Sequence, residues 1–137
     1  LIIDSPWLPG WAGVSTLDYF YDEQTWLEAN FKAVRRFPEI MFLPGFWSEY
    51  GMCTEPSAFG GKCVWYEEGF PSVGKILGDC AEVDRLKKPD PRTDGLLPWV
   101  LKRLVRSRAA IDRPAMVFGS CATVFFCGMP SAAAGPV

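Results

Sequence analysis

Histidine is absent from all 137 residues of this chain. Because imidazole is the common general base near neutral pH, its absence excludes Ser–His–Asp and Cys–His catalysis from these residues. Long hydrophobic runs are also missing: no stretch approaches the ~20 apolar residues of a membrane span. Residues 1–3 are apolar but too short, and without the basic flank, for a signal peptide. We therefore expect a cytoplasmic protein that does not cross a membrane.

Closely spaced cysteine pairs are missing as well. The chain has an odd number of widely spaced cysteines and no C-x-x-C motif. A small secreted domain held by disulfides favours an even number. We therefore expect reduced, mostly buried thiols, and Cys121 has no histidine to activate it as a nucleophile. The five are Cys53, Cys63, Cys80, Cys121 and Cys127.

An excess of positive charge is lacking too. The net charge is −2, and no basic face indicates nucleic-acid binding. Nine of the 14 Lys and Arg residues lie between Arg85 and Arg113, which we interpret as a solvated helix surface. Apolar residues make up 49% of the chain and aromatic residues 15%, so the sequence predicts one folded domain with a substantial core.

Two segments have the periodicity of amphipathic helices. The first begins at Asp22, whose carboxylate can cap Gln24 or Thr25, and ends before Pro38. Its expected buried positions are Trp26, Leu27, Asn30, Phe31 and Val34. The second begins near Pro98, with an expected buried stripe of Val100, Leu101, Leu104 and Val105. Its residues expected to face water are Lys102, Arg103, Arg106 and Arg108.

Short apolar or alternating runs between these helices predict strands at residues 39–43, 62–66 and 114–118. Short helical turns are expected over residues 55–59 and 81–86, and loops over residues 70–77 and 90–95. Residues 1–14, rich in Pro, Gly and Trp, are expected to form an extended arm.

Alternation of strands and helices predicts an α/β fold with parallel strands, here the amino-terminal portion of a (β/α)8 TIM-type barrel. A complete barrel needs about 250 residues, so residues 15–137 can supply only its first units. Such a portion exposes strand edges and needs the remainder of the barrel or a complementary chain for stability. Together with the missing initiator Met, this predicts a longer parent protein.

Several short motifs, in their order and spacing, resemble the amino-terminal part of the uroporphyrinogen decarboxylase family. They are Arg36-Phe37-Pro38, Ala58-Phe59-Gly60, Val83-Asp84-Arg85-Leu86, Pro89-Asp90-Pro91 and the run from Pro114 to Gly119. The resemblance covers roughly residues 15–130. It implies a (β/α)8 barrel, whose chemistry lies at the carboxyl ends of the strands.

In such a barrel, residues 46–51 and 119–123 would line the pocket. Glu49 and Glu55 are therefore the candidate catalytic carboxylates. The candidate substrate-binding residues are Trp47, Tyr50, Gly119 and Ser120. Glu49 could equally cap a helix or face solvent, and Glu55 could serve a helix N-terminus. Trp47 and Tyr50 could equally be core residues, since most aromatic side chains are.

Departures from the family pattern favour one branch over another. Gly51 stands where the decarboxylases carry an Asp, and residues 1–13 lack their arginine-rich motif for substrate carboxylates. Glu55, before Pro56 and Ser57, is similar to a Glu of the corrinoid-linked methyltransferases. That branch uses zinc to activate a thiol, but its ligands belong to the later half of the barrel, so no metal ligand is assigned here.

The resemblance thus implies an enzyme, as part of a full barrel, for corrinoid-linked methyl transfer or demethylation. Its substrate would be a small molecule or a corrinoid protein, with zinc and a corrinoid as cofactors of the complete enzyme. Decarboxylation of a porphyrinogen-like substrate is one alternative. A non-catalytic or truncated barrel subunit that needs a complementary chain is the other. The expected partners also include a second copy of the chain, as a homodimer.

Overall fold

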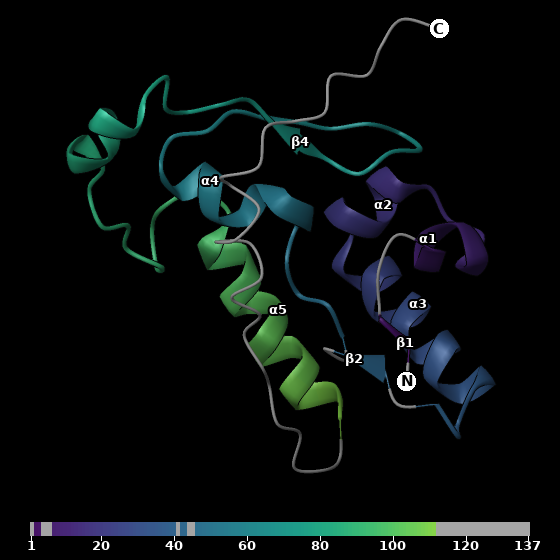
Figure 1. Cartoon of the computed structure of the whole chain (residues 1–137). Coiled ribbons are helices and arrows are strands. Elements are labelled where there is room, and N and C mark those ends of the chain that lie inside the picture. The colour runs from purple at the N-terminus through teal and green to yellow at the C-terminus, as the bar shows by residue number, and fades with distance from the viewer. Residues whose placement is uncertain (1, 4–6, 41, 44–45, 112–137) are drawn as a thin grey trace, which may run out of the picture.

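The computed structural model describes residues 2–3, 7–40, 42–43 and 46–111. A strand and three helices lead to a second strand, and a short helix and a hairpin lead to a final long helix (Figure 1). The elements are β1 Ile2–Ile3, α1 Trp7–Ala12, α2 Thr16–Tyr21, α3 Glu23–Arg36, β2 Phe42–Leu43, the 3-10 helix η1 Gly51–Cys53, α4 Thr54–Ala58, β3 Cys63–Val64, β4 Ser72–Val73, the 3-10 helix η2 Cys80–Arg85 and α5 Leu97–Ala110.

The predicted arm over residues 1–14 is wrong where α1 forms. This helix packs against α2 and α3, and its Leu8 lies in the core. Burial of that apolar side chain favours a helix that local composition did not predict. The strand predicted over residues 114–118 lies outside the described residues. Among the described helices, none has the length and apolar character needed to cross a membrane.

Helix α3 begins and ends where the sequence predicts. The Asp22 carboxylate accepts hydrogen bonds from the backbone N–H groups of Gln24, at 3.3 Å, and Thr25, at 2.8 Å. These bonds satisfy amides that have no partner inside the helix. A hydrogen bond from the Thr25 hydroxyl, together with these backbone bonds, holds the pKa of Asp22 below its usual value. Trp26, Leu27 and Asn30 are buried as expected. The prediction for Val34 is wrong, because its side chain is exposed.

The two described strand pairs differ in direction. β1 and β2 are parallel, with Ile2 opposite Phe42 and Ile3 opposite Leu43, and α1, α2 and α3 connect them. A helical crossover between parallel strands is the unit from which α/β sheets are built. β3 and β4 form an antiparallel pair. The predicted strands over residues 39–43 and 62–66 are therefore real but shorter, and β4 occupies part of a predicted loop.

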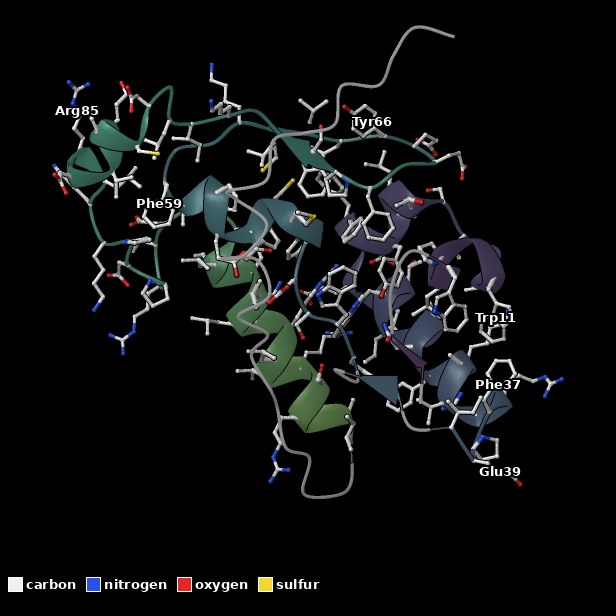
Figure 2. The ribbon with its side chains drawn as sticks, in the orientation of Figure 1. Trp11, Phe37, Glu39, Phe59, Tyr66 and Arg85 are labelled. Atoms are coloured by element: carbon white, nitrogen blue, oxygen red, sulfur yellow. The ribbon has the colours of Figure 1, made fainter. Side chains whose placement is uncertain are left out.

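The core is aromatic and lies where the first three helices meet residues 46–70. Phe20 is at its centre, with its ring centroid 5.3 Å from Phe70, 6.0 Å from Tyr50 and 6.1 Å from Trp65. The Phe70 and Trp65 rings meet Phe20 edge-on, a favourable arrangement of ring quadrupoles. At the margin of the fold, Trp11 and Phe37 lie side by side (Figure 2), with ring centroids 5.6 Å apart.

Helix α5 starts at Leu97, as Pro98 predicts, but its buried face differs from the predicted one. Arg103 is 0% exposed and Ser107 is buried, whereas Leu101 is 41% and Val105 72% exposed. The predicted stripe is therefore wrong at Leu101 and Val105, and Arg103 does not face water. The reason lies in α2, whose last carbonyls need hydrogen-bond donors that an apolar side chain could not supply.

The basic residues beside Arg103 also contact α3. Lys102 Nζ lies 2.8 Å and Arg106 Nη1 3.7 Å from the carboxylate of Glu23. Arg106 Nη2 also donates a hydrogen bond to Gln24 Oε1 at 2.8 Å. Lys102 and Arg106 are exposed, as the interpretation of a solvated surface predicts, and their ion pairs with Glu23 also attach α5 to the N-terminus of α3.

Candidate functional site

The candidate site is the segment 46–55, which follows β2 and leads into α4. Its start is fixed by α3. Trp26 Nε1 donates a hydrogen bond to the carbonyl of Trp47 at 3.0 Å, and the Phe46 ring meets Phe31 edge-on, with centroids 4.9 Å apart. The buried indole N–H thereby gains the partner it requires. The start of the predicted pocket-lining segment, at Phe46 and Trp47, is thus held against α3.

Trp47 and Glu49 are brought together. Trp47 Nε1 donates a hydrogen bond to Glu49 Oε2 at 3.1 Å. The Trp47 ring stacks on Phe70, with centroids 6.1 Å apart and planes 26° from parallel. One face of the indole therefore packs against Phe70 inside the protein. Glu49 is half-buried, and the indole N–H restricts the orientation of its carboxylate.

Tyr50 lies in the core. Its side chain is buried, and the guanidinium carbon of Arg103 lies 4.1 Å from its ring centroid. Burial raises the pKa of Tyr50, and the positive charge of Arg103 offsets part of this rise. Its backbone N–H donates to Thr54 Oγ1 at 2.9 Å, which joins the segment to the start of α4. Tyr50 is thus placed to support the site through packing.

Gly51 and Glu55 follow Tyr50 in the chain, in η1 and α4. Glu55 is in the first turn of α4, and its Oε2 atom is buried. Gly51 has φ of +57°, and a Cβ there would lie 3.4 Å from Phe70 and Pro71. An Asp at this position would meet ordinary contacts but an unfavourable left-handed backbone. Gly119 and Ser120 lie outside the described residues.

Arg103 is the site-forming residue that sequence analysis missed. Its Nη2 donates to the carbonyls of Phe20 at 2.7 Å and Tyr19 at 3.2 Å. The guanidinium lies between aromatic rings, 4.7 Å from the Trp26 centroid on one side and near Tyr50 on another. Burial lowers the pKa of Arg103, which the nearby tyrosines and Glu23 partly offset. An arginine counts as a polar residue in the hydrophobic pattern of a helix, so this pattern could not indicate that Arg103 is buried.

The described residues do not fit a zinc site. No group of three or more His, Cys, Asp or Glu side chains in this part of the chain is arranged to hold a metal ion. Structural and catalytic zinc sites need three or four such ligands.

The chain matches no protein-family model, no curated protein and no solved structure.

Proposed function

We propose that this chain is the amino-terminal portion of a (β/α)8 barrel enzyme of the uroporphyrinogen decarboxylase type that transfers a methyl group to or from a corrinoid. The observation that carries the proposal is the position of Glu49, six residues beyond β2 of a parallel strand pair. Enzymes built on such barrels use residues that follow the carboxyl ends of the strands.

Glu49 is suited to accept a proton or a hydrogen bond from a substrate. The Trp47 N–H donates a hydrogen bond to its Oε2 atom, which restricts the orientation of the carboxylate. A fixed carboxylate of this kind can act as a general base toward a thiol that receives the methyl group. Glu55 would provide a second carboxylate from α4.

Porphyrinogen decarboxylation is the weaker alternative. The residue at the position of the decarboxylase Asp is Gly51, whose left-handed backbone suits glycine. A carboxylate cannot be provided there by this chain. Glu49 lies two residues earlier, where its carboxylate is paired with an indole N–H.

Methylcobalamin with 2-mercaptoethanol as methyl acceptor tests the proposed reaction. The complete barrel enzyme, of which this chain is the proposed amino-terminal portion, should catalyse thiol-dependent loss of methylcobalamin, followed by absorbance. Replacing Glu49 with Gln should lower the rate at least about tenfold, because proton transfer by a positioned side chain commonly contributes more than this. Glu55→Gln should have a smaller effect.

Glu39→Gln is the matched control. Glu39 is exposed at the edge of the fold (Figure 2), so its replacement should leave the rate unchanged. Turnover that is equal in the Glu49 and Glu39 variants would remove Glu49 from the site. A complete enzyme that binds methylcobalamin but never demethylates it would contradict methyl transfer.

A non-catalytic barrel portion is a second candidate, favoured by the apolar face of α5. Trp99, Leu101 and Val105 are exposed on this helix, and a barrel helix normally buries such residues against strands. A further chain that supplies the remaining strands of the barrel could cover this face. If the face drives association, a second copy of the chain should also bind to it, and this self-association can be measured.

Light scattering at increasing protein concentration measures whether this face drives association. The wild-type chain should self-associate, and the double variant Leu101→Glu with Val105→Glu should be monomeric at the same concentrations. Tyr21→Glu is the control, because Tyr21 is similarly exposed but lies on α2. A monomeric wild-type chain, or equal association in all variants, would count against this candidate.

A further inference from the structure

Arg103 of α5 carries hydrogen-bond donors that the fold buries without an acceptor. Its Nη2 donates to the last carbonyls of α2, but its Nε and Nη1 are buried and have no hydrogen-bond partner among the described residues. Ser107 lies one turn later on the same buried face of α5, and its Oγ atom is likewise buried without a partner in this part of the chain. Buried polar groups in folded proteins nearly always have a partner. These three atoms therefore point to a ligand that accepts hydrogen bonds.

The positive charge of Arg103 is also poorly neutralised. Glu23 is the described carboxylate whose charge acts on the guanidinium. That carboxylate already forms ion pairs with Lys102, at 2.8 Å, and with Arg106, at 3.7 Å. Three cations of α5 thus share one carboxylate, and the one at Arg103 is 0% exposed. Because a charge removed from water without a counter-charge is costly, the guanidinium should attract an anion.

The surroundings of the guanidinium limit the size of that anion. Its central carbon lies 4.7 Å from the ring centroid of Trp26 and 4.1 Å from that of Tyr50. Arg103 is fully covered and Ser107 is 5% exposed. A large anion would have to displace an aromatic ring of the core, which is costly in a closely packed interior. A small inorganic anion requires less space and brings the negative charge that a water molecule lacks.

We propose that Arg103 and Ser107 form a binding site for a small inorganic anion, such as chloride, between α5 and the aromatic core. The anion would accept hydrogen bonds from a free guanidinium N–H and from the Ser107 hydroxyl, and it would offset the excess positive charge of α5. The proposal does not depend on the function proposed above. Because only the folded chain brings α5 against the core, binding of the anion should stabilise the fold.

Thermal unfolding of the full chain in two sodium salts of matched ionic strength tests the proposal. Chloride is the probe, and gluconate is an anion too large for the site. Both salts screen the ion pairs of Glu23 to the same extent. We expect the unfolding temperature to be higher in chloride than in gluconate. The difference should level off as the chloride concentration rises, as it does for a single saturable site.

Substitutions in α5 locate the bound anion. Arg103→Met should abolish the difference between the two salts. Ser107→Ala keeps the buried charge, so it provides the test if Arg103→Met does not fold. It should raise the chloride concentration for half of the effect about tenfold, as for the loss of one hydrogen bond to a charged group.

Arg85→Met is the matched control, because the Arg85 side chain is 79% exposed, and it should keep the wild-type difference between the salts. Equal unfolding temperatures of the wild-type chain in chloride and gluconate would overturn the proposal. An undiminished effect of chloride in either Arg103→Met or Ser107→Ala would overturn it too, because the anion would then bind elsewhere.

Discussion

Replacing Arg103 with methionine is expected to lower the free energy of unfolding by about 3 kcal/mol, as for the loss of a buried charged donor with two acceptors. Methionine keeps much of the side-chain length but donates no hydrogen bond. The carbonyls of Tyr19 and Phe20 at the end of α2 would lose their donor. The aromatic rings of Trp26 and Tyr50 would lose the guanidinium that lies against them.

Urea unfolding followed by tryptophan fluorescence measures this change. Arg85→Met is the matched control, since the Arg85 side chain is 79% exposed and its ion pair with Glu82 lies on the surface. Its effect should stay below about 0.5 kcal/mol. Arg103→Lys should be intermediate, because an ammonium keeps the charge without the planar group that packs between rings.

A more stable Arg103→Met variant would contradict this account. Buried charges can cost more in desolvation than they return, and apolar replacement then stabilises the fold. Such a result would mean that the last carbonyls of α2 find other hydrogen-bond donors when Arg103 is absent. It would also mean that Arg103 is retained for a property other than stability.

The substitution Gly95→Ala is expected to cost about 3 kcal/mol, from a left-handed backbone and a steric overlap together. Gly95 has φ of +55°, and a Cβ there would lie 2.4 Å from both the backbone nitrogen of Ala58 and Ser57 Oγ. One of these atoms is backbone, so no side-chain rotation relieves the overlap. The chain entering α5 would have to move away from α4.

This movement would break a specific contact. Ser57 Oγ accepts a hydrogen bond from the backbone N–H of Leu96 at 2.9 Å and donates to the carbonyl of Thr54 at 2.6 Å. Gly74→Ala is the control, because Gly74 has no atom within 4 Å of an added Cβ. Its effect in the same urea titration should be within about 0.5 kcal/mol. Equal stability of the two variants would show that the α4–α5 junction is not closely packed.

The sequence could predict those elements whose signals are local. The Asp22 cap and Pro38 placed both ends of α3, and Pro98 placed the start of α5, because each acts within one turn. The buried face of α5 could not be predicted in the same way. It depends on carbonyls more than 80 residues away in the sequence, which accept hydrogen bonds from Arg103.

The candidate site was predictable only in part, for a related reason. Trp47 and Glu49 are close in the sequence and do meet, through one hydrogen bond. From the sequence, Tyr50 could have been either a ligand-binding residue or a core residue. The structure buries it beside Phe20, and this depends on how α2 packs.

The attachment of α5 through Glu23, Lys102 and Arg106 also bears on how this helix responds to dissolved salt. Dissolved salt weakens attraction between charges near the surface, with a screening length of about 8 Å at physiological ionic strength. The Arg103 guanidinium, which joins α5 to the carbonyls of Tyr19 and Phe20, is fully buried, and salt screens buried charges much less. Rising ionic strength should therefore weaken the Glu23 ion pairs of α5 while the buried contacts of Arg103 persist, so the attachment of α5 has one salt-sensitive and one salt-resistant part.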